Sequence, residues 1–325
     1  MMPRGGISVL AWAPLWIALA SGGAAAVAPV PCDTGAGACW TPALSTRWQY
    51  QLEGRRNRFV ESGGINVDIC MVPFTAGPCV TPDVFDIDPY VDSDLSGEGN
   101  FVVNTAAVNA IHARGKRAIC YVSAGDIESF RPDYQAFVDF DATCGHCLIG
   151  RPFSARFADE FWANINNDRG QRDFMLQMIE QRVQTCAGAG FDGIEFDVVD
   201  AYAQGQAVTG WDISPATQLD YNQRLANLAH TYGLTVALKN DLGQLADLLP
   251  YFDYAINEQC FEFEECDNNP APGYAGWVAA GKAVFQVEYR RSPRRFCALA
   301  NAANFNSIKK SGNFRLRDRK WKPCR

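Results

Sequence analysis

The chain has 325 residues, of which 48% are hydrophobic and 20% are charged. A chain with this hydrophobic share can bury a large core, which excludes an intrinsically disordered protein and a Gly/Pro-repeat fibre. The net charge of −7 and the sequence pI of about 5.1 argue against nucleic-acid binding, because an acidic surface repels phosphate backbones.

The N-terminal residues 1–28 have the pattern of a secretory signal peptide. Arg4 supplies the positive charge, residues 7–20 are apolar, and an A-x-A cleavage site ends at Ala28. An uncleaved membrane anchor is the alternative, but the apolar run is shorter than the ~20 residues that a membrane span needs. We therefore expect a secreted protein whose mature part, residues 29–325, is one domain, monomeric and free of the membrane.

Twelve cysteines, an even number, indicate disulfide bonds formed in an oxidising compartment. The spacing allows four local pairs: Cys260 with Cys266, Cys297 with Cys324, Cys70 with Cys79, and Cys32 with Cys39. Cys144 and Cys147 form a C-x-x-C motif, which on its own is typical of a redox dithiol. A redox motif should follow a strand and open a helix, whereas this one lies in a loop. A structural disulfide, or two separate bridges, is the preferred interpretation.

Short β-branched and aromatic runs alternate with stretches of helical spacing after about residue 45. The expected strands are 48–52, 65–70, 118–123, 193–197, 235–238, 254–257, 283–287 and 305–308. Helical spacing covers 103–113, 174–186 and 219–232, and a glycine follows each of these stretches as a C-cap. Eight such units predict an α/β fold, a single closed (β/α)8 TIM-type barrel. A doubly wound open sheet is the structural alternative.

The longest connection, residues 125–169, follows the third expected strand. It contains Phe153, Phe157, Phe161 and Trp162, and this aromatic content argues against disorder. Long loops in compact domains are usually functional. After a barrel strand, such a loop lies over the mouth where substrates bind.

Acidic residues occur where two expected strands end. Glu195 and Asp197 are two residues apart, so their side chains point to the same face of a strand, which in a barrel is the interior. Glu258 ends another strand. Two carboxylates on opposite sides of a scissile bond can act as nucleophile or base and as proton donor in glycoside hydrolysis. A buried structural network is the alternative for Glu195 and also for Asp197.

Further polar residues at or near strand ends have the composition of a sugar pocket. They are Asp68, Tyr121, Ser123, Lys239, Asn240, Asp241, Glu288 and Tyr289. Other chemistries have less support, because the chain has only three histidines (His112, His146 and His230) and lacks the G-x-S-x-G elbow and the glycine-rich nucleotide-binding loops. We expect neither a metal ion nor a cofactor.

Several motifs in combination carry a family resemblance. They are residues 120–125 (CYVSAG), Glu128 with Arg131 and Asp133, residues 190–193 (GFDG) leading into Glu195 and Asp197, residues 238–241 (LKND), residues 255–260 (AINEQC), and Glu288 with Tyr289. From about Trp48 to Lys309, the sequence resembles glycoside hydrolase family 114, the endo-α-1,4-polygalactosaminidases.

This resemblance implies a (β/α)8 barrel, no required cofactor, and hydrolysis within an α-1,4-linked galactosamine-containing polysaccharide. It places the two catalytic acids on Asp197 and Glu258. Our hypothesis is that Asp197 is the nucleophile or stabiliser and Glu258 the general acid/base, with the exchanged assignment as the alternative. The family pattern around the first acid is Glu-Pro-Asp-Asn-Val-Asp, from which this chain departs at Phe196 and Val198.

The charge of the expected pocket agrees with a cationic substrate. Free galactosamine units carry ammonium groups, which would be attracted by Asp68, Glu195, Asp197, Asp241, Glu258 and Glu288. Two other functions remain open. One is hydrolysis of a different amino-sugar polymer such as chitosan, and the other is a secreted glycan-binding barrel without catalysis.

Overall fold

The computed structural model describes residues 27–325 except 34, 36, 56–57, 92–100 and 267–270. The expected signal peptide therefore lies outside the described residues, apart from Val27 and Ala28. Within the described ranges, no helix combines the length and the apolar character that a membrane span requires.

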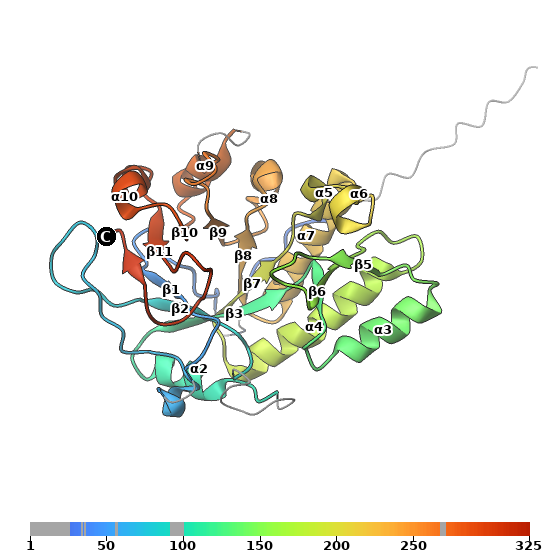
Figure 1. Ribbon diagram of the computed structural model, residues 1–325, viewed down its shortest axis with the longest axis horizontal. Coiled ribbons are helices and arrows are strands. Elements are labelled where there is room, and N and C mark those ends of the chain that lie inside the picture. Colours follow the sequence, from blue (N-terminus) through green and yellow to red (C-terminus); the bar gives the residue numbers. More distant parts are fainter. Residues whose placement is uncertain (1–26, 34, 36, 56–57, 92–100, 267–270) are drawn as a thin grey trace, which may run out of the picture.

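In the described part of the chain, a curled sheet of nine strands forms the centre of the molecule (Figure 1). Eight strands run parallel in chain order: β1 (Trp48–Tyr50), β2 (Val84–Ile87), β3 (Arg117–Ser123), β7 (Gly193–Asp197), β8 (Thr235–Lys239), β9 (Tyr254–Glu258), β10 (Val284–Glu288) and β11 (Asn306–Lys309). Their order and direction confirm the TIM-type α/β fold rather than a doubly wound sheet.

The first and last parallel strands, β1 and β11, do not pair with each other, so in the described part of the chain the barrel is not closed by strand pairing as expected. The short strand β12 (Lys322–Pro323) pairs antiparallel with β11. Trp48 Nε1 donates to Asn306 O at 2.7 Å, and Trp321 Nε1 donates to Trp48 O at 3.0 Å. Side chains and the C-terminal segment therefore link β1 to β11, so that the curled sheet has a buried interior.

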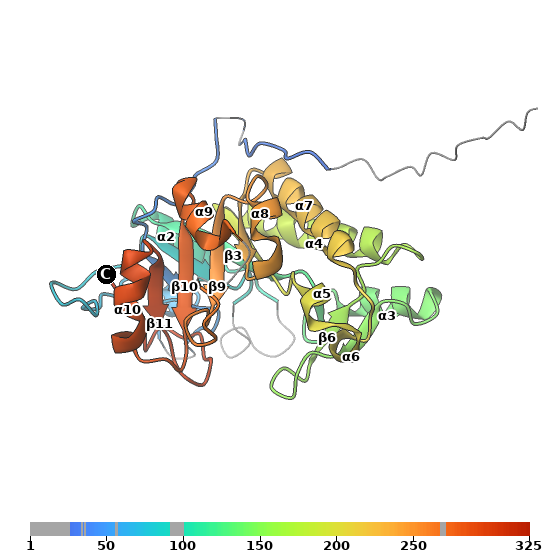
Figure 2. The same cartoon turned by 90° about the horizontal axis from the view of Figure 1, so that it is seen from above.

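Helices cover the outside of the sheet (Figure 2). They are α2 (Thr105–His112), α4 (Gln171–Ala189), α7 (Pro215–Thr231), α8 (Leu245–Leu248), α9 (Gly273–Ala279) and α10 (Pro293–Ala302), with 3-10 turns η1 (Val60–Ser62) and η2 (Leu242–Gln244). The three helices expected from the sequence are confirmed as α2, α4 and α7. The C-cap of α4 is Gly190, whose φ of 87° lets its N–H reach the carbonyls of Cys186 and Ala187.

The long connection after β3 is an ordered small sheet with its own helix. Strands β4 (Asp126–Glu128), β6 (Glu160–Ala163) and β5 (Ile149–Pro152) pair antiparallel, and α3 (Tyr134–Thr143) lies between β4 and β5 in the chain. This small sheet, α3, α5 (Ala201–Gln204) and α6 (Gln206–Thr209) gather at one end of the molecule in Figures 1 and 2.

The strand expected at residues 65–70 is wrong, and β2 lies at Val84–Ile87 instead. Ile65, Val67 and Ile69 alternate because they bury one face against the core, but their backbone joins no strand. Alternation of apolar and polar residues indicates that one side of a segment is buried. An irregular segment can be buried in this way as well as a strand.

Six disulfides form, and they leave no free cysteine among the described residues. The four expected local pairs are confirmed, and Cys144 pairs with Cys147 as a structural bridge beside α3. The sixth bridge, Cys120–Cys186, joins β3 to α4 across a sequence separation of 66. It could not be expected from spacing, because only the barrel packing brings these residues together.

Candidate active site

The carboxyl ends of β7, β8 and β9 bring three acidic side chains around one buried lysine. Lys239, which is 1% exposed, has its Nζ 3.0 Å from Asp197 Oδ1, 3.2 Å from Glu195 Oε1 and 3.3 Å from Glu258 Oε2. Burial alone would lower the pKa of this lysine, but the three carboxylates outweigh burial and hold its pKa well above the usual value. The lysine is therefore charged and ties the three acids together.

This shared contact limits the distance between the two acids that end their strands. Asp197 Oδ1 and Glu258 Oε2 can be no farther apart than the sum of their distances to Lys239 Nζ, 6.3 Å. Carboxyl pairs in glycosidases lie ~5–5.5 Å apart in retaining enzymes and ~6.5–9.5 Å apart in inverting enzymes. The pair is close enough to act on one glycosidic bond.

Each of the three acids accepts a hydrogen bond from its own tyrosine: Tyr121 donates to Asp197 (2.9 Å), Tyr50 to Glu195 (3.2 Å) and Tyr289 to Glu258. Burial raises the pKa of all three phenols well above the usual value, and the neighbouring carboxylates raise it further. The tyrosines therefore stay protonated and act as donors that orient the carboxylates.

Asp197 and Glu258 differ in their surroundings. Asp197 Oδ1 also accepts the backbone N–H of Val198 at 2.9 Å, so this carboxylate has donors on both oxygens. The backbone N–H of Glu258 donates to Asn240 Oδ1 at 3.0 Å, which positions the end of β9. The Glu258 side chain is 28% exposed and that of Asp197 19%. Asp197 is thus held by donors on both of its carboxylate oxygens and is the less exposed of the two acids.

The backbone turns sharply after each of these strands. Val198, Asn240 and Gln259 have φ values of 61°, 49° and 63°, which are unfavourable for residues with a Cβ, most of all for the β-branched Val198. A Cβ on Gly125, after β3, would lie 1.6 Å from Val198 O. Gly125 therefore permits the turn that follows Asp197, and such strained backbone is typical of functional sites.

A second layer of acid lies beneath the lysine. Asp86, on β2, is fully buried, and burial together with the charge of Glu195 raises its pKa well above the usual value. A hydrogen bond from its protonated carboxyl to Glu195 gives a partner to Glu195 Oε2 and to one of the two Asp86 oxygens, none of which has another partner in the described part of the chain. Glu195 contacts Lys239 directly, Asp86 contacts Glu195, and neither acid reaches the solvent.

A cavity of about 640 Å³ opens above the lysine. Asp197 and Glu258 line it with Tyr121, Asn240 and Tyr289. A second hollow of about 450 Å³ shares Asp200, Gln204, Asn240, Glu258 and Gln259 with the first. The two hollows form one extended cleft, and Glu258 lies where they meet.

The small sheet and its loops form the roof of this cleft, as expected for the long connection. Phe153, Phe157 and Trp162 line the cavity from this side. Arg156, between β5 and β6, donates to Asn313 O and stacks 4.8 Å from the Phe314 ring, which belongs to the segment after β11. The roof therefore contacts the opposite side of the cleft.

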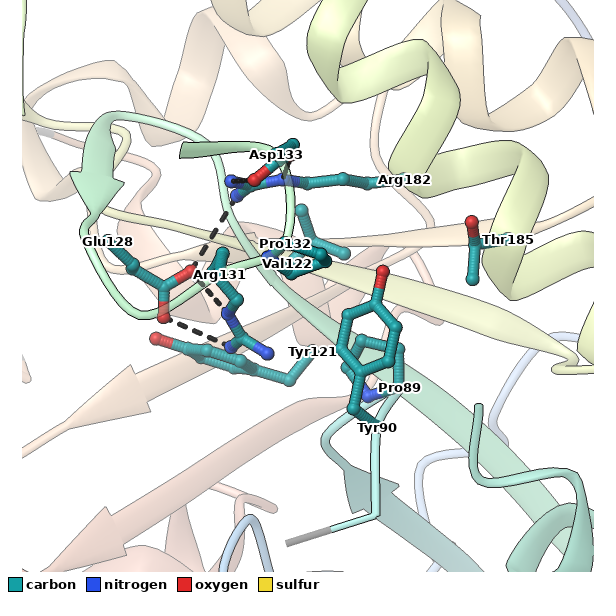
Figure 3. A pocket seen from close by; sticks show the side chains of 10 residues that line it. All are labelled: Pro89, Tyr90, Tyr121, Val122, Glu128, Arg131, Pro132, Asp133, Arg182 and Thr185. Atoms are coloured by element: carbon teal, nitrogen blue, oxygen red, sulfur yellow. Dashed lines mark hydrogen bonds and ion pairs between the residues drawn. The ribbon is translucent and has the colours of Figure 1, made fainter. Parts of the chain in front are cut away.

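An ion network fixes the base of the roof (Figure 3). Glu128 lies between the guanidinium groups of Arg131 (2.8 Å) and Arg182 (3.6 Å). Arg131 also pairs with Asp88 after β2, and Arg182 pairs with Asp133. The motif Glu128, Arg131 and Asp133 thus joins the roof to the barrel and to α4.

The structure places most of the expected site residues either on the wall of the cavity or beneath it. Tyr121, Asn240 and Tyr289 line the cavity with the two acids. Ser123, Glu195, Lys239 and Glu288 are at most 1% exposed and line neither hollow, so a sugar in the cleft does not contact their side chains directly. Their assignment as direct sugar contacts is therefore corrected, because inward-facing positions below the strand ends are sealed by the residues above them.

Two further expectations change. Asp68 is wrong as a site residue: its side chain is 70% exposed and pairs with Arg114 at 2.5 Å on the surface, since residues 65–70 are not a barrel strand. Asp241 lines only the second hollow and is 2% exposed, where Tyr202 and Asn222 donate to its two oxygens at 3.0 and 2.9 Å.

Glu288 has a structural role that its buried position explains. Its Oε1 accepts the backbone N–H of Phe261 at 2.9 Å and of Glu262 at 3.3 Å. These two residues follow Cys260, whose disulfide with Cys266 closes the same loop. Glu288 therefore shapes the loop after β9, next to Glu258.

Sequence reasoning missed several acids in or next to the cavity, among them Asp86, Glu160 and Asp200. Asp86 was not considered because the second strand was expected at residues 65–70 and not at Val84–Ile87. Glu160 lies on β6, within a connection that shows no regular pattern. Asp200 lies three residues after Asp197 and lines both hollows, and burial raises its pKa to about 6. Its closeness in sequence to Asp197 was the signal that could have identified Asp200.

The three histidines lie away from the cleft, and each contacts an aspartate: His112 with Asp192, His146 with Asp141, and His230 with Asp253. Within the described ranges, no three His, Cys, Asp or Glu side chains are arranged to hold a metal ion.

The comparisons with known proteins agree with this geometry. The sequence model of glycoside-hydrolase family GH114 matches residues 31–322. Ega3 of Aspergillus fumigatus, solved in complex with galactosamine, is similar with a TM-score of 0.66 and 26% identity over 88% of this chain and 97% of that chain. The glycoside hydrolase domain of PelA from Pseudomonas aeruginosa shares the fold, with a TM-score of 0.51 and 11% identity over 86% and 98% of the two chains. No curated protein sequence matches the chain.

Proposed function

The chain belongs to glycoside-hydrolase family GH114, and we propose that this glycoside hydrolase is secreted and cleaves within α-1,4-linked galactosamine-containing polysaccharide. The observation that carries the proposal is the pair of acids, Asp197 and Glu258, held by one buried lysine at the floor of an extended cleft.

Asp197 is the nucleophile in this proposal. Tyr121, Lys239 and the backbone N–H of Val198 all donate to its carboxylate and hold it in a fixed orientation for attack on the anomeric carbon. Glu258 is the general acid/base. It protonates the leaving glycosidic oxygen and then accepts a proton from the water that releases the sugar from Asp197.

The shape and charge of the cleft support an internal cut in a cationic polymer. Two connected hollows on either side of Glu258 give room for sugar units on both sides of the scissile bond. Acids line the cleft, and ammonium groups on the sugar would be attracted to them. Ega3, the similar fungal protein, holds galactosamine in its solved complex.

We also propose that residues 1–28 are a signal peptide and that residues 29–325 form a single, monomeric catalytic domain outside the cell. The six disulfides support an oxidising compartment.

A polysaccharide panel tests the proposed substrate. The purified protein is incubated with deacetylated galactosaminogalactan, its fully N-acetylated form and chitosan, and the products are sized by mass spectrometry. We expect oligomers of intermediate length early in the reaction with the galactosamine polymer. Cleavage of chitosan alone would favour a different amino-sugar substrate, and binding without any shortening would favour a non-catalytic glycan-binding protein.

A further inference from the structure

Glu160 is an acid of the roof for which the proposed mechanism gives no role. It lies on β6 and lines the same cavity as Asp197 and Glu258. In the register of the small sheet it lies directly opposite Glu128 on β4. Like charges in directly opposed strand positions destabilise a sheet, so this pair costs the fold stability.

The other acids that line the cavity, apart from the catalytic pair, have partners of their own. Asp88 and Glu128 pair with Arg131, and Glu53 pairs with Arg315 and Arg317. Asp200 accepts a hydrogen bond from Gln204. Among the described residues, Glu160 forms no ion pair, and the group that acts on its carboxyl most closely is another acid, Asp126, whose side-chain oxygens have no other partner.

Asp126 lies beneath Glu160 and is 1% exposed. Burial raises the pKa of Asp126 well above the usual value, and the charges of Glu128 and Glu160 add to this effect. It is therefore protonated and donates to Glu160. Burial likewise raises the pKa of Glu160 to about 7, with Glu128 and Asp197 adding to it and Arg131 opposing it. A cation bound to Glu160 would offset the unfavourable burial of its carboxylate and the repulsion from Glu128 and Asp197.

Aromatic side chains next to Glu160 form a surface on which a sugar ring can stack. The Phe153 and Trp162 rings lie 4.6 Å apart, and Phe157 lies 6.2 Å from Phe153. All three line the cavity. An exposed aromatic ring such as Phe157 beside a carboxylate without a counter-charge suits an amino sugar, whose ring face is apolar and whose ammonium group needs an acceptor.

We propose that Glu160 binds the ammonium group of a sugar unit in the cleft and so sets the preference for free amino sugars over N-acetylated ones. This inference rests on the proposed function and deepens it. An N-acetyl group carries no charge and is bulkier, so it would leave the carboxylate without a counter-charge. A site built for a hydrogen-bonding group discriminates strongly against an analogue that lacks it.

The test compares two forms of one polymer, deacetylated galactosaminogalactan and the same material after chemical N-acetylation. The wild type, Glu160→Gln and the remote control Glu61→Gln, an exposed acid of η1, are assayed for kcat and KM on both. We expect Glu160→Gln to lose about 10- to 100-fold in kcat/KM on the cationic polymer, mainly through KM, and to change less than about threefold on the N-acetylated one. Glu61→Gln should match the wild type.

The outcomes separate the inference from the proposed function. An unchanged ratio between the two substrates in Glu160→Gln would overturn the role of Glu160 while leaving the enzyme's activity established. A wild type that cleaves neither polymer would instead contradict the proposed function. Inhibition of the wild type by free galactosamine and by N-acetylgalactosamine gives a second measure that needs no variant. Equal inhibition by the two sugars would also overturn the inference.

Discussion

Lys239 Nζ lies 3.0 Å from Asp197 Oδ1 and 3.3 Å from Glu258 Oε2. One side chain that solvent and substrate do not reach thus sets the distance between the two proposed catalytic groups. Because the lysine is at the end of β8, between β7 and β9, the order of the strands itself creates the acid pair.

Replacing this lysine should impair both stability and activity. Lys239→Met leaves three carboxylates without their shared cation, which should cost about 3–5 kcal/mol in the free energy of unfolding. The acids also lose their spacing, and we expect kcat/KM to fall by at least about 100-fold. Denaturant unfolding and a hydrolysis assay measure the two effects.

Lys310→Met is the matched control. Lys310 is equally buried but donates to Gln49 and to the carbonyl of Arg317, away from the acids. This variant should lose stability and keep its kcat/KM when folded. Equal losses of activity in both variants would contradict the role of Lys239 in spacing the acids.

The distance limit also predicts the stereochemical outcome. The two oxygens that contact Lys239, Asp197 Oδ1 and Glu258 Oε2, lie no more than 6.3 Å apart, which accommodates the ~5–5.5 Å carboxyl separation of retaining enzymes. We therefore expect retention of the α configuration. Proton NMR of the first products, recorded before mutarotation, should show the α anomer. An initial β anomer would contradict the double-displacement mechanism.

The turn after Asp197 depends on Gly125. Gly125→Ala would place a methyl group 1.6 Å from Val198 O, and this backbone carbonyl cannot move without moving the N–H that holds Asp197. We expect a loss of at least about 3 kcal/mol in stability together with a loss of activity.

Gly188→Ala, near the end of α4, provides the contrast. An added Cβ there meets no neighbouring atom, and alanine favours a helix over glycine by about 1 kcal/mol. This variant should therefore be as stable as the wild type or more so. Thermal unfolding of the two variants side by side checks the prediction, which fails if Gly125→Ala behaves like Gly188→Ala.

The sequence predicted the architecture well because the signals were local. Strand β9 and its terminal Glu258 follow from a short β-branched and aromatic run, and α4 from its helical spacing and Gly190. The same reasoning misplaced β2, since burial of one face at residues 65–70 imitates a strand. As a consequence, Asp68 was predicted to be the acid on the second strand of the barrel, whereas that acid is Asp86.

The site was predicted less completely than the fold. Asp197 and Glu258 follow from their positions at strand ends, but the burial of Glu195 and Lys239 depends on the layers packed above them. The Cys120–Cys186 bridge and the carboxyl pair of Asp126 and Glu160 depend on long-range packing. No local pattern in the sequence contains that information.

Asp241 should give stability a pH dependence. Burial raises its folded-state pKa to about 8, whereas the unfolded chain ionises near 3.9. Folding therefore takes up a proton between these values, so the stability that Asp241 contributes is fully present below about pH 4 and is lost as the pH rises toward 8.

Asp241→Asn removes this proton uptake. Its unfolding free energy should fall less steeply between pH 5 and 7 than that of the wild type, by up to about 1.4 kcal/mol per pH unit. Activity should persist, because Tyr202 and Asn222 are the partners of this side chain. Asp139→Asn, an exposed acid on α3, should leave the wild-type slope unchanged. Identical slopes in all three proteins would refute the prediction.

The most direct test of the central claim is the turnover of Asp197→Asn and Glu258→Gln on deacetylated galactosaminogalactan, measured with their thermal unfolding. Glu262→Gln, which changes a nearby acid of the loop after β9, is the control. The account predicts that both amide variants lose at least about 1,000-fold in kcat and unfold within a few degrees of the wild type, while the control stays active. Near-normal turnover in either amide variant would contradict the claim that these two carboxylates carry the reaction.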